Sequence, residues 1–115
     1  TWAAGLANML WALVAKASSE QALNAKTTTI LNWTDAGVAS WYDCAVAIQE
    51  LALEQGLITK AIPISAIPAA SYPTPAKRPA FSVLNKAEAE AQSGVNTVHW
   101  RAQLKAMLTE LKLNQ

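Results

Sequence analysis

The sequence of 115 residues has one cysteine, Cys44, one histidine, His99, and few charges. A single thiol forms no internal disulfide, and one cysteine with one histidine falls short of a structural metal site. We therefore assign the chain to the cytoplasm. Nine basic residues balance eight acidic ones, leaving a net charge of +1, so the chain lacks the positive surface that binds nucleic acids or anionic membranes. We expect partners of neither kind.

Glycine is scarce too, with four residues scattered along the chain, so no glycine-rich phosphate-binding turn is present. The longest apolar stretch, within residues 6–14, is broken by Asn8 and is too short to cross a bilayer. We expect neither a transmembrane helix nor a signal peptide. However, 52% of the residues are hydrophobic and only 15% are charged, against about 25% charged in typical domains. This composition predicts that some apolar surface faces a partner outside the chain.

Helical periodicity is clearest in the first half of the chain. Apolar residues at three- and four-residue steps predict a helix over about residues 3–17. A second helix is predicted to start after Ser40, whose hydroxyl can accept a hydrogen bond from the backbone N–H of Asp43. Gly56 suits the left-handed residue that follows a helix, so we end this helix near Gln55.

Two further helices are predicted in the second half. Asn85 with Glu88 three residues later resembles a capping box, which predicts a short helix over residues 86–92 that ends at Ser93-Gly94. Thr97 is predicted to cap the last helix. The apolar face of that helix comprises Trp100, Leu104, Met107, Leu108 and Leu111.

Two segments favour strands. Residues 27–34 are rich in β-branched side chains, and residues 57–67 mix such side chains with Pro63, which suits an edge strand. A strand, a helix and a second strand make a small α/β unit if the strands are parallel. We therefore predict one α/β domain over residues 1–115, mostly helical with a thin sheet.

Residues 71–79 contain three of the five prolines. Each proline fixes φ and favours extended geometry at the residue before it, so this proline arm should be stiff and non-helical. It carries Tyr72, Lys77 and Arg78, a set that suits a phosphate-bearing ligand because the guanidinium offers a planar fork of donors. A purely structural connection explains the prolines equally well, and residue types alone do not decide between the two interpretations.

The sequence offers no catalytic constellation. His99 and Cys44 have no partners at the spacing of a triad, and we expect a surface or packing role for His99 and a small core position for Cys44 on the apolar face of the second helix. The carboxylates of Asp35 and Asp43 are expected in solvated or capping roles, as are those of Glu88 and Glu90. Of the five tryptophans, Trp41 is the best placed to line a pocket, together with Tyr42, at the start of the second helix.

Two long segments resemble a known family. Residues 37–45, Gly-Val-Ala-Ser-Trp-Tyr-Asp-Cys-Ala, are similar to the Gly-x-x-Ser-Trp-Tyr-Asp-Phe-Ala segment of dTDP-4-dehydrorhamnose reductases. The proline arm, continuing to Asn85, resembles that family's Tyr-Pro-Thr-Pro-Ala-x-Arg-Pro-x-x-Ser-x-Leu element. The start of the chain and its last helix also resemble the family. The chain therefore looks like the carboxyl-terminal, substrate-binding part of such a reductase.

The resemblance implies an extended short-chain dehydrogenase with an N-terminal Rossmann domain that is absent from this chain. Such enzymes use NADPH, or NADH in some members, to reduce dTDP-4-dehydro-6-deoxy-L-mannose to dTDP-L-rhamnose for polysaccharide synthesis. No tyrosine here has lysine four residues on, so we expect no catalytic residue, no cofactor-binding residue and no activity from this chain alone. The expected substrate-binding residues are Arg78 at the diphosphate, Lys77, Tyr72 and Trp41.

Some members of the family form homodimers with a bound metal ion, and one of its acidic residues corresponds to Glu110. Ala4 and Gly5 stand where its acidic companion would be needed, which argues against Mg²⁺-linked dimerisation here and leaves a homodimer of the full-length protein open. Two other interpretations remain. One is a catalytically silent relative, like the regulatory beta-subunit of methionine adenosyltransferase, and the other is a stand-alone interaction module of amphipathic helices.

Overall fold

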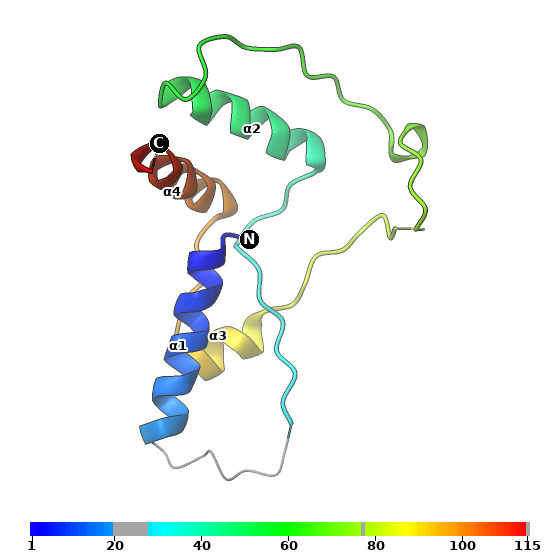
Figure 1. The fold of residues 1–115 in the computed structure, drawn as a ribbon. Helices are drawn as coiled ribbons and strands as arrows, with labels where there is room; N and C mark the ends of the chain where they lie inside the picture. The colour runs from blue at the N-terminus through cyan, green and yellow to red at the C-terminus, as the bar shows by residue number, and fades with distance from the viewer. Residues whose placement is uncertain (20–27, 77, 115) are drawn as a thin grey trace. The chain divides into compact units, whose positions relative to one another are not determined.

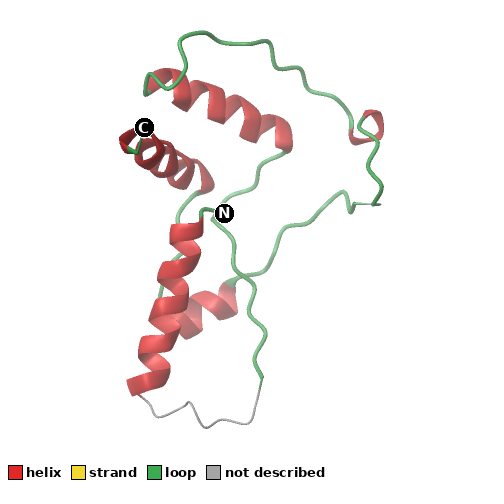
Figure 2. Ribbon diagram, viewed as in Figure 1, coloured by secondary structure: helices red, strands yellow, loops and turns green. Residues whose placement is uncertain are grey.

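A computed structural model describes residues 1–19, 28–76 and 78–114 (Figure 1). These residues contain four α-helices and a short 3₁₀ turn, and no strand occurs among them (Figure 2). The chain forms two compact units. Unit 1 comprises Thr1–Gly37 with Leu84–Gln103, and unit 2 comprises Val38–Val83 with Leu104–Gln115. No described helix combines the length and apolar character needed to cross a membrane.

Unit 1 is built on helix α1, Ala3–Ser19, which confirms the first predicted helix. Met9 is only 3% exposed, and α1 packs against α3, Ala87–Ser93, in which Ala89 is fully buried. The Lys16 ammonium donates a hydrogen bond to the backbone carbonyl of Gln92, 3.1 Å away. The core of unit 1 is thus formed by one face of α1 against a short, alanine-rich helix.

Helix α3 begins and ends close to the predicted residues. The Asn85 side chain accepts a hydrogen bond from the Ala87 N–H at 3.1 Å. This bond closes a local turn and is no helix cap, so the predicted capping box is wrong: Lys86 is the residue before the helix and makes no side-chain capping bond, and the Glu88 carboxylate accepts from the Gln92 side chain. Gly94, with φ of +73°, ends the helix in the left-handed conformation that glycine adopts at low cost.

Helix α4, Trp100–Leu113, contributes its first turn to unit 1 and the rest to unit 2. The prediction that Thr97 caps this helix is wrong. The N–H and the hydroxyl of Thr97 both donate to Oε1 of Glu90 in α3, at 2.9 and 2.6 Å. Both bonds lower the pKa of Glu90, and the bond from the hydroxyl has the larger effect. Thr97 therefore ties the end of α3 to the segment before α4.

Unit 2 is built on helix α2, Trp41–Glu54, and the predicted cap is confirmed. The Ser40 hydroxyl accepts from the Asp43 N–H at 3.1 Å, and the Asp43 carboxylate accepts from the Ser40 N–H at 2.8 Å. This backbone bond and the bond from the Ser40 hydroxyl lower the pKa of Asp43. At the other end Gly56 has φ of +71°, as predicted for a residue that follows a helix.

The carboxyl end of α2 is joined to α4 by polar contacts. Lys105 forms an ion pair with Glu54 at 2.7 Å, and the Gln55 side chain donates to the Lys105 carbonyl at 3.1 Å. The ammonium of Lys112 donates to the Gln55 carbonyl. Ala47, Leu51 and Ala52 of α2 and Leu108 of α4 are the buried apolar residues of this unit.

Both strand predictions are wrong for the residues that the structure describes. Residues 28–34 and 57–67 belong to no ladder, while Thr27 lies outside the described residues. The one pairing of strand type within the described ranges is an isolated parallel bridge between Ala36 and His99. The mostly helical character is confirmed, but the thin sheet of the predicted α/β class is not, because β-branched side chains favour a strand only where a neighbouring strand pairs with it.

Candidate functional site

The described residues of the proline arm are exposed, and those after Ser71 are non-helical, as predicted. A 3₁₀ turn, η2, Ala69–Ser71, leads into it, and the Tyr72 N–H donates to the Ala69 carbonyl at 3.1 Å. Farther along, the Thr74 hydroxyl donates to the Ala76 carbonyl at 2.8 Å. The arm is therefore shaped by local turns and by its prolines rather than by burial.

The predicted binding residues lie in unit 2, and the side chains of those that the structure describes face solvent. Trp41, in the first turn of α2, is 85% exposed, and Tyr72 in the arm is 68% exposed. Arg78 is exposed as well. Lys77 lies outside the described residues. All three described side chains are thus accessible to a ligand.

The structure does not bring these residues into contact. Within the described part of the chain, no hydrogen bond, ion pair or ring contact links Trp41, Tyr72 and Arg78. Trp41 lies in the first turn of α2, whereas Tyr72 and Arg78 lie in the proline arm. The chain presents candidate ligand-binding groups on two separate segments of unit 2.

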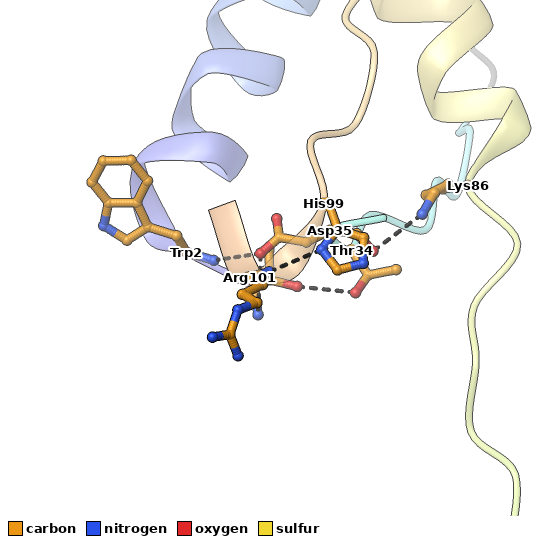
Figure 3. A network of polar contacts seen from close by, with 7 residues as sticks. Trp2, Thr34, Asp35, Lys86, His99 and Arg101 are labelled. Carbon is orange, nitrogen blue, oxygen red and sulfur yellow. Dashed lines mark hydrogen bonds and ion pairs between the residues drawn. The ribbon is translucent and has the colours of Figure 1, made fainter. Parts of the chain in front are cut away.

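A second polar cluster, in unit 1, centres on Asp35 (Figure 3). The Asp35 side chain is 6% exposed, and its carboxylate accepts from the Trp2 backbone N–H at 3.2 Å. Trp2 immediately precedes α1, and its carbonyl accepts from the Leu6 N–H. A buried carboxylate therefore lies at the positive end of the α1 dipole, where negative charge is favourable.

The backbone around Asp35 is held from two other segments. The Asp35 carbonyl accepts from the Lys86 ammonium at 3.1 Å (Figure 3). Next to it, Ala36 donates to the Val98 carbonyl at 2.8 Å and accepts from the Trp100 N–H at 2.9 Å. This Asp35 junction fixes the turn that leads toward Ser40 and α2.

His99 borders the same turn. Its Nδ1 accepts from the Arg101 N–H at 3.3 Å, and its ring is stacked obliquely on Trp100 with centroids 5.6 Å apart. Gly37 has φ of +87°, and a Cβ there would lie 2.5 Å from Nε2 of His99. This agrees with the surface or packing role predicted for His99, which is exposed and whose ring closes over a glycine that has no room for a side chain.

The described residues do not fit a nicotinamide dinucleotide. Such a cofactor places its diphosphate on bare N–H groups where a glycine-rich turn opens a helix. The helix that follows a glycine turn here, α2, has its amino end occupied by the Asp43 carboxylate, which repels phosphate. Nor do the described residues contain a group of three His, Cys, Asp or Glu side chains able to hold a metal ion.

Sequence reasoning missed the burial of Asp35, for which a solvated or capping role was expected. The buried carboxylate accepts a hydrogen bond from the backbone N–H of Trp2, 33 residues away. No local pattern reveals such a partner, because any backbone N–H looks the same in a sequence. Asp43, in contrast, is confirmed in its capping role, since its partner Ser40 is three residues away.

Comparison with known proteins matches residues 1–113 to the model of the RmlD substrate binding domain. The chain is similar to the dTDP-4-dehydrorhamnose reductase of Burkholderia thailandensis, with 33% identity over 88% of this chain and 35% of the relative. The reductase of Escherichia coli K12 is 35% identical over 65% of this chain and 25% of the relative. The spore coat polysaccharide biosynthesis protein SpsK of Bacillus subtilis is 36% identical over 70% of this chain and 26% of the relative.

No solved structure matches the chain. The chain spans about a third or less of the length of the curated relatives that it matches. The family model covers nearly every residue, including the Asp35 junction, α2 and the proline arm. This protein therefore belongs to the RmlD substrate-binding domain family.

Proposed function

We propose that this chain is the carboxyl-terminal, sugar-nucleotide-binding part of a dTDP-4-dehydrorhamnose reductase. The proposed reaction reduces the 4-keto group of dTDP-4-dehydro-6-deoxy-L-mannose, with NADPH as reductant, and gives dTDP-L-rhamnose. The membership of its family and the names of its relatives support this assignment. The site of the cofactor and the catalytic tyrosine then belong to an N-terminal Rossmann-type domain outside this chain.

The observation that carries the proposal is the exposed proline arm with Arg78. Prolines limit the backbone freedom that is lost when Arg78 binds a ligand, and the planar guanidinium offers a fork of donors that matches two phosphate oxygens. Arg78 binds the diphosphate in this proposal, and Lys77 adds a second, weaker contact. Tyr72 contributes a wall or a hydrogen bond, and the exposed Trp41 indole offers an apolar face to the ligand.

The arm is tested by replacing Arg78 in the full-length protein. A charge-assisted bond to phosphate contributes about 1.5–3 kcal/mol, so Arg78→Ala should raise the dissociation constant for dTDP roughly tenfold or more. Arg78→Lys should recover part of the loss, since lysine keeps the charge without the fork. Calorimetric titration with dTDP measures both variants.

Lys60→Ala provides the matched control. Lys60 is an exposed cation in the segment of residues 57–83, which also carries the proline arm. Its affinity for dTDP should equal that of the unmodified protein. If Arg78→Ala binds dTDP as tightly as the Lys60→Ala control, Arg78 does not contact the diphosphate.

A further inference from the structure

Helix α1 is apolar on nearly every side. Its 17 residues, Ala3–Ser19, include one charged residue, Lys16. A helix of this kind is normally buried all round, because any apolar face left in water costs free energy. Amphipathic helices that lie on membranes carry a basic face, which a single lysine bonded to Gln92 does not provide.

Among the residues of unit 1 that the structure describes, only one side of α1 is covered. Met9 is buried and Ala12 and Leu13 are half-buried on the side that packs against α3. On the other side the side chains of Leu10, Val14 and Trp11 are 50, 51 and 72% exposed. Ala7, Leu10, Trp11 and Val14 line an open hollow of about 240 Å³. We call these four residues with Leu6 the α1 stripe.

We propose that the α1 stripe is the surface on which the part of the longer protein outside this chain packs. The proposal rests on the proposed function in treating this chain as one part of a reductase. The curated relatives support a large missing part, since this chain spans 25 to 35% of their length. The partner is an apolar face of that part, with a side chain that fills the hollow beside Trp11.

The size of the stripe favours a covalently attached partner over a second copy of this chain. Stable interfaces between separate proteins use roughly 20–30 residues a side, several times more than the five residues of the α1 stripe. A covalent connection raises the effective concentration of the partner to about the millimolar range, so a small apolar patch is enough. Domain contacts within one chain are accordingly smaller.

Hydroxyl-radical labelling of the full-length protein, read by mass spectrometry, tests the proposal at Trp11. We expect Trp11 to react far more slowly in the native protein than in urea, as a covered indole does. Val14→Asp introduces a charge into the stripe and should accelerate labelling of Trp11. Ala91→Asp, the matched control, adds the same charge at an exposed alanine of α3 in the same unit, away from the stripe, and should leave Trp11 protected.

Labelling of native Trp11 at the rate found in urea overturns the proposal, whether or not the Val14→Asp variant folds. Protection that depends on protein concentration and disappears in the monomer also overturns it, because the occupant is then a second copy. The dTDP titration of Arg78→Ala reports on the arm alone. Normal dTDP binding by that variant together with a protected Trp11 refutes the Arg78 assignment and keeps the docking surface. Weakened dTDP binding together with an unprotected Trp11 keeps the Arg78 assignment and refutes the docking surface.

Discussion

Gly37 and Gly94 show how two glycines with similar backbones differ in what surrounds them. Both have positive φ, +87° and +73°. A Cβ at Gly37 would lie 2.5 Å from Nε2 of His99 and 3.0 Å from the Trp100 ring, whereas nothing lies within 4 Å of one at Gly94. A side chain at Gly94 thus costs backbone strain alone. A side chain at Gly37 costs that strain and also displaces the rings of His99 and Trp100.

Replacing these two glycines by alanine should therefore lower the free energy of unfolding by different amounts. Gly94→Ala should lower the free energy of unfolding by about 1–2 kcal/mol, the cost of left-handed backbone for an L-residue. Gly37→Ala should lower it by clearly more, because His99 and Trp100 must also move. Urea unfolding of the full-length protein measures both variants. Equal losses would show that the packing of His99 over Gly37 is absent in solution.

At the same scale, sequence predicts the residues whose partners are near in the chain. The Ser40 cap was predictable because Asp43 follows at three residues, and Gly56 and Gly94 were predictable because helices end at such residues. Asp35 was not, because its carboxylate binds the N–H of Trp2. The exposure of Arg78 and Tyr72 follows from the prolines, but a ligand contact does not.

At the scale of elements, the helices were predictable and the strands were not. Apolar spacing predicted α1, α2 and α4, and the end signals at Asn85 and at Ser93-Gly94 predicted α3, each close to its observed position. The helices form from hydrogen bonds within each segment, so local sequence carries most of the information. Residues 28–34 have the composition of a strand, but a strand requires a partner, and no described segment pairs with them.

The bond between Glu90 and Thr97 makes the stability that it gives to α3 depend on pH. The pKa of Glu90 lies below its ordinary value because Thr97 donates to the charged form. The stabilisation is fully present above the unfolded pKa, about 4.3, and is lost as pH falls through the lower folded pKa. In an NMR titration of the full-length protein, the Thr97 amide signal should move with a midpoint below about 4.3.

Two variants control this titration. Glu90→Gln should abolish the movement of the Thr97 signal, since the amide does not titrate. Glu88→Gln should preserve it, because Glu88 bonds Gln92 and not Thr97. A Thr97 midpoint at or above the ordinary value for glutamate contradicts the bonding seen here.

For the whole molecule, the composition predicts apolar surface that faces a partner. The described residues expose apolar side chains on α1 and along residues 57–76 and 78–83. Trp11, Ile62 and Phe81 are among the exposed apolar residues. The long segment that carries the proline arm is bonded to α2 near its start, where the N–H groups of Leu57 and Ile58 donate to the Ala52 carbonyl and the Ile62 N–H donates to the Gln49 side chain. Loops of this length in compact proteins usually serve a function, which suits the presentation of Arg78.

The most direct test of the central claim is NADPH oxidation by the full-length protein with dTDP-4-dehydro-6-deoxy-L-mannose. Our account predicts that one NADPH is consumed for each dTDP-L-rhamnose formed, with chromatography identifying the product. Tight binding of the nucleotide sugar without oxidation of NADPH would contradict it, because the protein would then be a catalytically silent relative. Absence of both binding and oxidation would refute the assignment of the substrate as well.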